Sequence, residues 1–286
     1  MANIRLIKRR IKSAGNIAQI TRAMELVAAS KMKRAQALAV AGKTYAQKIH
    51  DMVVRLAAKA EAEKHPLLRR AGGANGKRLL VLLSTDKGLC GGLNTNLFRF
   101  LLTEYPDLKN VHAVSVGKKG TAMLVRTGAQ LMADFSDTIP RAAAVPALVA
   151  LITQSYTSGT YDLVDVVFSE FISVARQQPR IKRLLPITIE SLPEKEKDLP
   201  IELLIEPSVD EVFEALLPHY IENQLRDALF QAEASEHSSR MIAMRNATDN
   251  AMALMEDLTL LYNKARQEKI TYEITDMVTA RLAVAE

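Results

Sequence analysis

The chain has 286 residues, of which 48% are hydrophobic and 5% aromatic, with no Trp, one Cys and a net charge of +6. This length and composition are typical of a globular protein with one or two domains. The longest apolar runs are too short to span a bilayer, and the N-terminus lacks the apolar core of a secretory signal. Its first turns are basic and amphipathic, which leaves a transit peptide as an alternative. The single cysteine, Cys90, excludes an internal disulfide and fits a reducing compartment.

The charge is distributed unevenly. Residues 1–60 hold thirteen Lys and Arg against two acidic residues, whereas residues 219–286 hold seven basic and eleven acidic residues. Segments of opposite net charge are suited to lie side by side. The surplus positive charge indicates an anionic partner, which could be nucleic acid, anionic lipid or an acidic protein surface. Aromatic residues are not interleaved with the basic ones, which argues against single-stranded nucleic acid.

Proline and glycine divide the chain into three parts. All ten prolines and ten of the twelve glycines lie between Pro66 and Pro218. Because proline breaks helix interiors and glycine weakens them, the two ends are predicted to be very long helices. We expect an N-terminal coiled-coil helix over 1–65, a Rossmann-like α/β domain over 66–208 and a C-terminal coiled-coil helix over 209–286.

Apolar and small residues recur at heptad spacing in both terminal segments, which predicts an antiparallel coiled coil whose register the sequence does not fix. The N-terminal seam has two polar interruptions, Thr21 and Glu25. A second apolar line runs beside it there, so either the buried face rotates around the helix or a second partner is met. This second line consists of Ile17, Ile20, Met24 and Val27.

The middle segment alternates between strand and helix patterns, which favours a small sheet with Rossmann-like winding. The predicted strands cover 78–84, 111–116, 130–135, 163–174, 181–189 and 201–206, the fourth and fifth forming a possible hairpin. The predicted helices cover 94–105, 120–127 and 145–156. Residues 64–77 have the composition of a linker, and 193–200 that of a charged loop.

The best candidate for a ligand site is the glycine-rich loop over 85–92, which follows a strand and precedes a helix. Its amides could hold a phosphate, but its spacing matches neither the Walker A motif nor the dinucleotide fingerprint. A tight turn or a protein contact is favoured, with Lys87 a surface charge. The five histidines lack ligand spacing and no nucleophile motif is present, so no catalytic, metal or cofactor residue is expected.

Three motifs in order resemble the gamma subunit of F-type ATP synthase. The stretch from Ile7 to Lys33, and within it Ile20 to Met32, resembles the N-terminal signature of that family, and Ser84 to Asn94 resembles its second. The C-terminal signature is matched by 247–251 and then by 261–267 with 270–275. The resemblance covers both ends and the middle at the expected length.

The resemblance implies a central rotor shaft. In this family the terminal helices form an antiparallel coiled coil inside a hexameric ring of alpha and beta subunits, and the α/β domain contacts the epsilon subunit and the c-ring. Proton flow turns the shaft, which drives ATP synthesis at beta-subunit sites and regulates hydrolysis. The chain is then a non-catalytic subunit, present once per complex, without nucleic acid. It would lie peripherally on the cytoplasmic face of a bacterial membrane, associated with that membrane through the complex.

The resemblance also implies residues for subunit contact and coupling. Met24 matches a methionine near the beta-subunit lever, and Arg266 with Gln267 matches a polar pair that faces a beta-subunit loop. Gln19 and Gly15 stand where many members have Lys, and near the C-terminus Val278-Thr279-Ala280 lacks the usual glycine. The full set of expected contact residues is Arg9, Arg10, Arg22, Met24, Lys87, Arg266, Gln267, Thr271, Glu273 and Thr275.

Two other interpretations remain at the level of sequence. A coiled-coil scaffold or adaptor would self-associate without ATPase subunits. A nucleic-acid-binding arm would show a steep salt dependence of its affinity.

Overall fold

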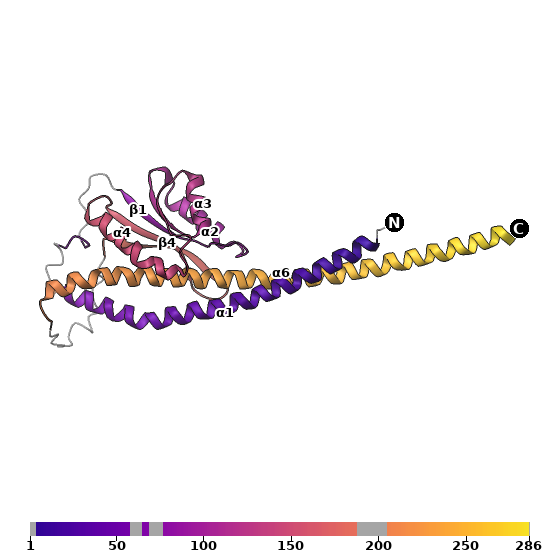
Figure 1. Cartoon of the computed structure of the whole chain (residues 1–286), viewed down its shortest axis with the longest axis horizontal. Coiled ribbons are helices and arrows are strands. Elements are labelled where there is room, and N and C mark those ends of the chain that lie inside the picture. The colour runs from indigo at the N-terminus through magenta and orange to yellow at the C-terminus, as the bar shows by residue number, and fades with distance from the viewer. Residues whose placement is uncertain (1–3, 58–64, 69–76, 188–204, 286) are drawn as a thin grey trace. The chain divides into compact units, whose positions relative to one another are not determined.

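A computed structural model describes residues 4–57, 65–68, 77–187 and 205–285 (Figure 1). The chain forms two compact units. The helical unit comprises residues 1–29 and 240–286, and the α/β unit comprises residues 30–239. Two long helices, α1 (Ile4–Ala57) and α6 (Val209–Ala285), contribute to both units. The predicted division at residues 65 and 208 stays a prediction.

In the helical unit, α1 and α6 pack along the predicted seam. Ile7, Ala14 and Ala28 of α1 are buried, as are Met244 and Ala251 of α6. Most of these side chains are small, so the two backbones approach closely. The expectation of a coiled coil is confirmed here.

Polar contacts fix the direction and register of this pair. The hydroxyl oxygens of Thr21 and Thr248 lie 2.7 Å apart, and the Arg245 Nε atom lies 3.7 Å from the Glu25 carboxylate. In both pairs the residue numbers add up to 269 or 270, so the helices run antiparallel. Thr21 and Glu25, the two interruptions of the apolar seam, are therefore buried polar contacts that define its register.

The α/β unit keeps the same register between the two helices. The Tyr220 hydroxyl lies 3.5 Å from His50 Nδ1, and the two rings stack. These residue numbers again add up to 270. The register that the sequence left open is thus the same in both units.

The second apolar line on α1 is exposed. Ile17, Ile20 and Val27 have exposed fractions of 49%, 60% and 56%, while Thr21 and Glu25 on the seam are buried. The buried face therefore does not rotate onto the second line within this chain. Of the two sequence interpretations, a second partner is the one that remains.

The α/β unit contains a five-stranded sheet in the order β3-β2-β1-β4-β5. The first four of these strands are parallel, and β5 pairs antiparallel with β4 as the predicted hairpin. The strands are β1 (Arg78–Leu83), β2 (His112–Val116), β3 (Gln130–Asp134), β4 (Leu163–Phe171) and β5 (Gln177–Leu185). The helices between them are α2 (Leu93–Glu104), α3 (Lys118–Thr127) and α4 (Val145–Thr157), with short turns η2 (Leu108–Asn110) and η3 (Arg141–Ala144).

Both faces of the sheet are covered. In β1, Leu80 and Leu82 pack with α2 and α3, whereas Leu79 and Val81 point to the other face, onto a core shared by α4, α1 and α6. A strand buried on both sides reads as a continuous apolar run, which is why β1 was predictable. The Rossmann-like expectation is confirmed.

The predicted hairpin strands were misplaced at their ends. Strand β4 stops at Phe171 rather than at residue 174, and β5 begins at Gln177 rather than at residue 181. The pairing of Gln177 with Phe171 extends β5 into a polar segment, which an edge strand tolerates. The predicted charged loop, most of the linker and most of the strand over 201–206 lie outside the described residues, and residues 205–206 are not in a strand.

We predict that Gly117→Ala destabilises the α/β unit by about 2–4 kcal/mol. Gly117 has a φ of 117°, and a Cβ atom built on it would lie 2.3 Å from the Ser84 carbonyl oxygen. Urea unfolding of the purified chain measures the loss. The matched control is Gly42→Ala in α1, where an added Cβ atom meets nothing within 4 Å. Because alanine has the higher helix propensity, this control should be more stable than the wild type by about 1 kcal/mol. Equal stability of Gly117→Ala and the wild type would show that this turn does not need glycine.

Candidate functional site

The glycine-rich loop lies at the carboxyl end of β1, where open α/β sheets bind ligands. Strand β1 has β2 on one side and β4 on the other, so the strand order reverses at this point. Ligands of doubly wound sheets bind in the crevice outside such a reversal. The loop over 85–92 therefore lies where a sheet of this kind would bind a ligand.

The loop is organised by its own side chains. The Thr85 hydroxyl donates to the Lys87 carbonyl at 2.9 Å, and Asn94 Nδ2 donates to the Thr85 Oγ1 atom at 2.7 Å. At its base, Ser84 Oγ accepts a hydrogen bond from the Gly120 amide at 2.7 Å. This pattern is that of a tight turn whose polar groups bond within the protein.

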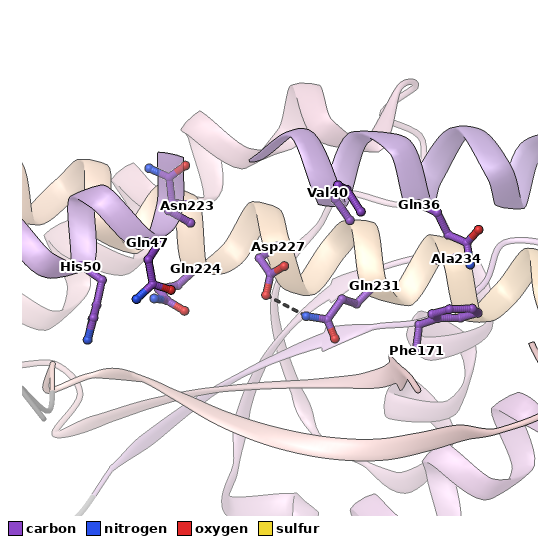
Figure 2. Close-up of a pocket in the computed structure, with 12 residues that line it drawn as sticks. Gln36, Val40, Gln47, His50, Phe171, Asn223, Gln224, Asp227, Gln231 and Ala234 are labelled. Atoms are coloured by element: carbon purple, nitrogen blue, oxygen red, sulfur yellow. Dashed lines mark hydrogen bonds between the residues drawn. The ribbon is translucent and has the colours of Figure 1, made fainter. Parts of the chain in front are cut away.

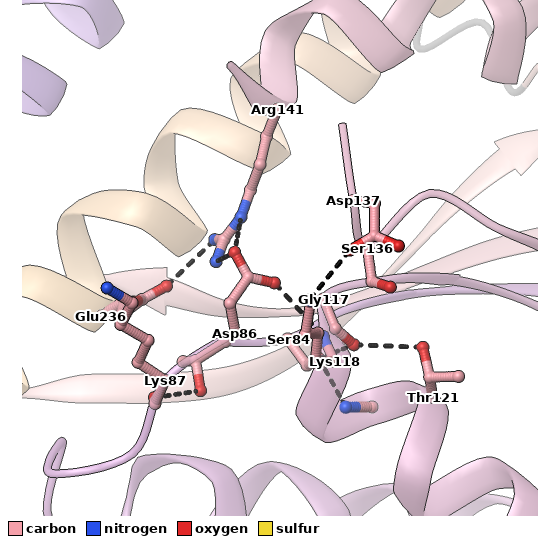
Figure 3. A network of polar contacts seen from close by, with 12 residues as sticks. Ser84, Asp86, Lys87, Gly117, Lys118, Thr121, Ser136, Asp137, Arg141 and Glu236 are labelled. Carbon is pink, nitrogen blue, oxygen red and sulfur yellow. Dashed lines mark hydrogen bonds and ion pairs between the residues drawn. The ribbon is translucent and has the colours of Figure 1, made fainter. Parts of the chain in front are cut away.

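One guanidinium occupies the space next to the loop. Arg141, in η3, contacts Asp86 through Nη2 at 2.8 Å and Nε at 3.3 Å, and Glu236 of α6 through Nη1 at 3.0 Å (Figure 3). The exposed fraction of the Arg141 side chain is only 14%. Asp86 also accepts a hydrogen bond from the Lys118 backbone amide at 3.2 Å.

The electrostatics of this network are dominated by carboxylates. Burial lowers the pKa of Arg141, but the charges of Glu236 and Asp86 outweigh it, so the net shift is upward and the guanidinium stays charged. Burial raises the pKa of Glu233, which lies one turn before Glu236 on α6. Arg141 opposes that rise, while Glu236 and Asp86 add to it.

This arrangement disfavours a phosphate group. Asp86, Glu233 and Glu236 place three carboxyl groups around the single guanidinium of Arg141. An incoming anion would compete with Asp86 and Glu236 for Arg141 and be repelled by all three. The space beside the loop is thus occupied by an ion-pair network that joins the loop to α6.

A groove also lies in the α/β unit, between α1, α6 and the end of β4. It has a volume of about 570 Å³ and is lined mainly by carboxamides and small apolar side chains (Figure 2). Asp227 accepts a hydrogen bond from Gln231 Nε2 at 2.7 Å. The lining residues are Gln36, Ala39, Val40, Ala46, Gln47, His50, Phe171, Asn223, Gln224, Asp227, Gln231 and Ala234.

In the part of the chain that the structure describes, no group of three or more His, Cys, Asp or Glu side chains could hold a metal ion. Within the same residues, no helix is long and apolar enough to cross a membrane. The chemistry that both sites offer is hydrogen bonding and charge pairing.

Nearly all of the expected contact residues lie in the helical unit. Arg9, Arg10 and Arg22 are exposed on α1, and Met24 is half-buried. The Arg22 guanidinium pairs with Glu25 at 2.9 Å. Lys87 is exposed in the loop of the α/β unit, so it belongs to a different unit from the other members of the set.

The C-terminal members of the set line one stretch of α6. Arg266, Gln267, Thr271, Glu273 and Thr275 are all exposed. The two threonine hydroxyls donate to carbonyls one turn earlier, and Glu273 pairs with Lys269 at 3.3 Å. These side chains are therefore directed away from any core of the chain.

This stretch of α6 also extends past its partner helix. In the register of the helical unit, α1 residue Ile4 lies level with position 266, so α6 continues beyond the described part of α1. Among the side chains that the structure describes there, up to residue 281, five large apolar ones are exposed. They are Ile270, Tyr272, Ile274, Met277 and Val278.

Sequence reasoning missed the ion-pair network. Arg141 lies far from Glu233 and Glu236 in the chain, and all three resemble ordinary surface charges. The spacing of Glu233 and Glu236, three residues apart on a helix, places both on one face, which was the only available signal. The exposed apolar lines on α1 and α6 are typical of a subunit of a larger protein assembly.

Comparison with known proteins identifies that assembly. The sequence profile of the family described as ATP synthase matches residues 3–284. The ATP synthase gamma chain of Roseiflexus castenholzii is 40% identical over the full length of both chains. The chain belongs to the ATP synthase gamma chain family, and its role is that of the central shaft of ATP synthase.

Solved structures agree with this assignment. A chain from the central stalk and c-ring structure of Tetrahymena thermophila mitochondrial ATP synthase has a TM-score of 0.57 and 26% identity, covering 80% of this chain and 99% of that one. A chain from the Euglena gracilis mitochondrial ATP synthase has a TM-score of 0.66 at 21% identity, covering 98% and 94%. The second likeness concerns the fold alone.

We predict that Glu233→Gln stabilises the chain at pH 8. The raised pKa means that the folded protein binds the Glu233 proton more tightly than the unfolded chain does. Ionised Glu233 therefore costs stability at high pH, and this cost disappears as the pH falls through the raised value. Thermal unfolding of both proteins should show that the variant melts at a higher temperature than the wild type at pH 8, and that this difference shrinks as the pH falls to 5. A difference that stays constant, or the same pH dependence in the exposed control Glu256→Gln, would contradict the raised pKa of Glu233.

Proposed function

We propose that this chain is a non-catalytic rotor subunit, present once per ATP synthase, that turns inside a hexameric ring of alpha and beta subunits. Its α/β domain contacts an epsilon subunit and a c-ring, and it lies peripherally on the cytoplasmic face of a bacterial membrane. The observation that carries the proposal is the exposed apolar surface of the helical unit. That surface needs a protein partner on α1 and another contact around the C-terminal end of α6.

The exposed apolar side chains support the ring as that partner. Soluble proteins rarely leave contiguous apolar patches uncovered, and such patches usually mark interaction sites. Ile17, Ile20 and Val27 form one line on α1, and Ile270 with Ile274 begins another on α6. A ring around a narrow helical pair would contact both lines at once.

The small seam residues support rotation in particular. Ala14, Ala28, Ala251 and Ala265 are buried between the two helices. Small residues shorten the distance between helix axes, which keeps the pair narrow. The basic residues Arg9 and Arg10 lie exposed beside the seam and would attract the acidic loop of a beta subunit, as the resemblance implies.

Isolation of the chain from gently solubilised membranes tests this proposal. A tagged chain should recover alpha, beta and epsilon subunits in a fixed ratio, after nuclease treatment and at one copy per three beta subunits. A variant with Ile17→Asp and Val27→Asp places charge on the exposed line and should lose the alpha and beta subunits. Recovery of the chain alone would favour the scaffold interpretation, and recovery of nucleic acid would favour the binding arm.

We predict that Met24→Lys impairs coupling more than assembly. Met24 is half-buried beside the Arg22–Glu25 pair, so a lysine can extend its ammonium group to solvent and leave the helix intact. The added charge would bind the acidic partner surface too tightly for smooth turning. The ratio of protons pumped to ATP hydrolysed should fall in membrane vesicles, while Met24→Leu keeps it. The idea fails if the lysine variant pumps and hydrolyses in normal proportion.

A further inference from the structure

The last residues of α6 within the α/β unit bind three separate segments of the domain through polar contacts. We call these contacts the polar collar. The Ser239 hydroxyl donates to the Cys90 carbonyl at 2.6 Å, the Ser238 hydroxyl donates to the Val174 carbonyl at 2.6 Å, and Glu236 accepts from Arg141 at 3.0 Å. Ser239 is also the last residue of the α/β unit.

The collar begins where the apolar packing of α6 ends. Phe213, Leu217, Leu225 and Leu229 of α6 belong to the core beneath the sheet. The hydrophobic driving force is not directional, so apolar packing resists rotation of a helix about its axis only through the fit of its side chains. Hydrogen bonds have narrow angular preferences and therefore oppose such rotation.

Arg141 supplies the only charged contacts among the collar bonds just described. Its guanidinium contacts Asp86 on one side and Glu236 on the other, with a side chain that is largely buried. Hydrogen bonds to ionised groups are roughly twice as strong as neutral ones, and the planar fork of arginine sets their direction. Asp86 is fixed in turn by the Lys118 amide, so the contact continues from α6 to the ends of β1 and β2.

We propose that Arg141 is a positioning residue of the rotary mechanism, which locks α6 against rotation about its own axis relative to the α/β domain. A turning force applied to the domain then reaches the helix without slippage. This inference rests on the proposed rotor function. Arg141 touches no reacting group, and it acts through Glu236 and Asp86.

Stability alone does not account for the network. A buried ion pair can often be replaced by well-packed hydrophobic side chains of similar volume without loss of stability. The triple variant Arg141→Met, Asp86→Asn and Glu236→Met replaces the two most buried members in this way, and the asparagine introduced at position 86 can still accept from the Lys118 amide. It should therefore fold as well as the wild type. It would nevertheless lack the directional contact, so stability and torsional locking can be separated by measurement.

The test is the torsional stiffness of the rotor in the assembled enzyme. The alpha–beta ring is fixed to a surface, and a gold particle is attached to the α/β domain through Glu104→Cys, an exposed position, while Cys90 is buried. The angular variance of the particle during catalytic pauses reports the stiffness. We expect Arg141→Met to raise this variance about twofold, because it removes the charged part of the collar.

Control variants make the outcome decisive. Arg180→Met removes the ion pair of Arg180 with Glu170, neither of which belongs to the polar collar, and should leave the variance unchanged. Arg141→Lys keeps the charge without the fork and should remain softer than the wild type. If Arg141→Met does not assemble, the triple variant provides the same comparison.

The results separate this inference from the function it rests on. If the wild type rotates and both Arg141→Met and the triple variant match its variance, the positioning role is overturned and the rotor function stands. If the wild-type chain neither enters the ring nor rotates, both proposals are overturned. A raised variance together with fewer protons pumped per ATP, at unchanged thermal stability of the triple variant, supports the role of Arg141.

Discussion

The burial of one helix on every side is the constraint on which the α/β unit depends. Every residue of α6 from Ile221 to Ser239 is buried or half-buried. Ile49 and Val53 of α1 meet this helix on one side, and α4 with the sheet meets it on another. A helix that is apolar on only one face could not bury apolar side chains against both α1 and the layer of α4 and the sheet. In the helical unit, by contrast, α6 buries a single stripe and leaves the rest of its surface for other proteins.

Much of this architecture could be predicted from the sequence because it depends on local signals. Proline and glycine are confined to the middle of the chain, which sets the two long helices, and the apolar run of β1 reveals a strand covered on both faces. The register could not be predicted, because a seam rich in alanine buries similar areas in several alignments. The Thr21–Thr248 contact decides between them, and it exists only once the two helices meet.

The candidate site likewise has one part that the sequence predicted and one part that it did not. The position of the glycine-rich loop follows from a strand and a helix that are adjacent in sequence, so it was found. Arg141 and Glu236 are separated by 95 residues, and neither has a local pattern that distinguishes it from a solvated charge. Their pairing follows from the strand order of the sheet and from the passage of α6 across its carboxyl edge. Tertiary proximity of this kind has no signature in a single sequence.

The register between α1 and α6, which is the same in each unit, restricts how the length of this protein can change during evolution. In the helical unit Gly15 lies level with Met255, and in the α/β unit His50 lies level with Tyr220, so facing residue numbers add up to 270 in both. A one-residue insertion in α1 would move every later seam position by about 100° around the helix. Only an insertion at the matching level of α6, or a whole number of heptads in both, would restore the fit. Natural length variation among relatives should therefore be concentrated in the connections of the α/β domain and at the ends of the two helices.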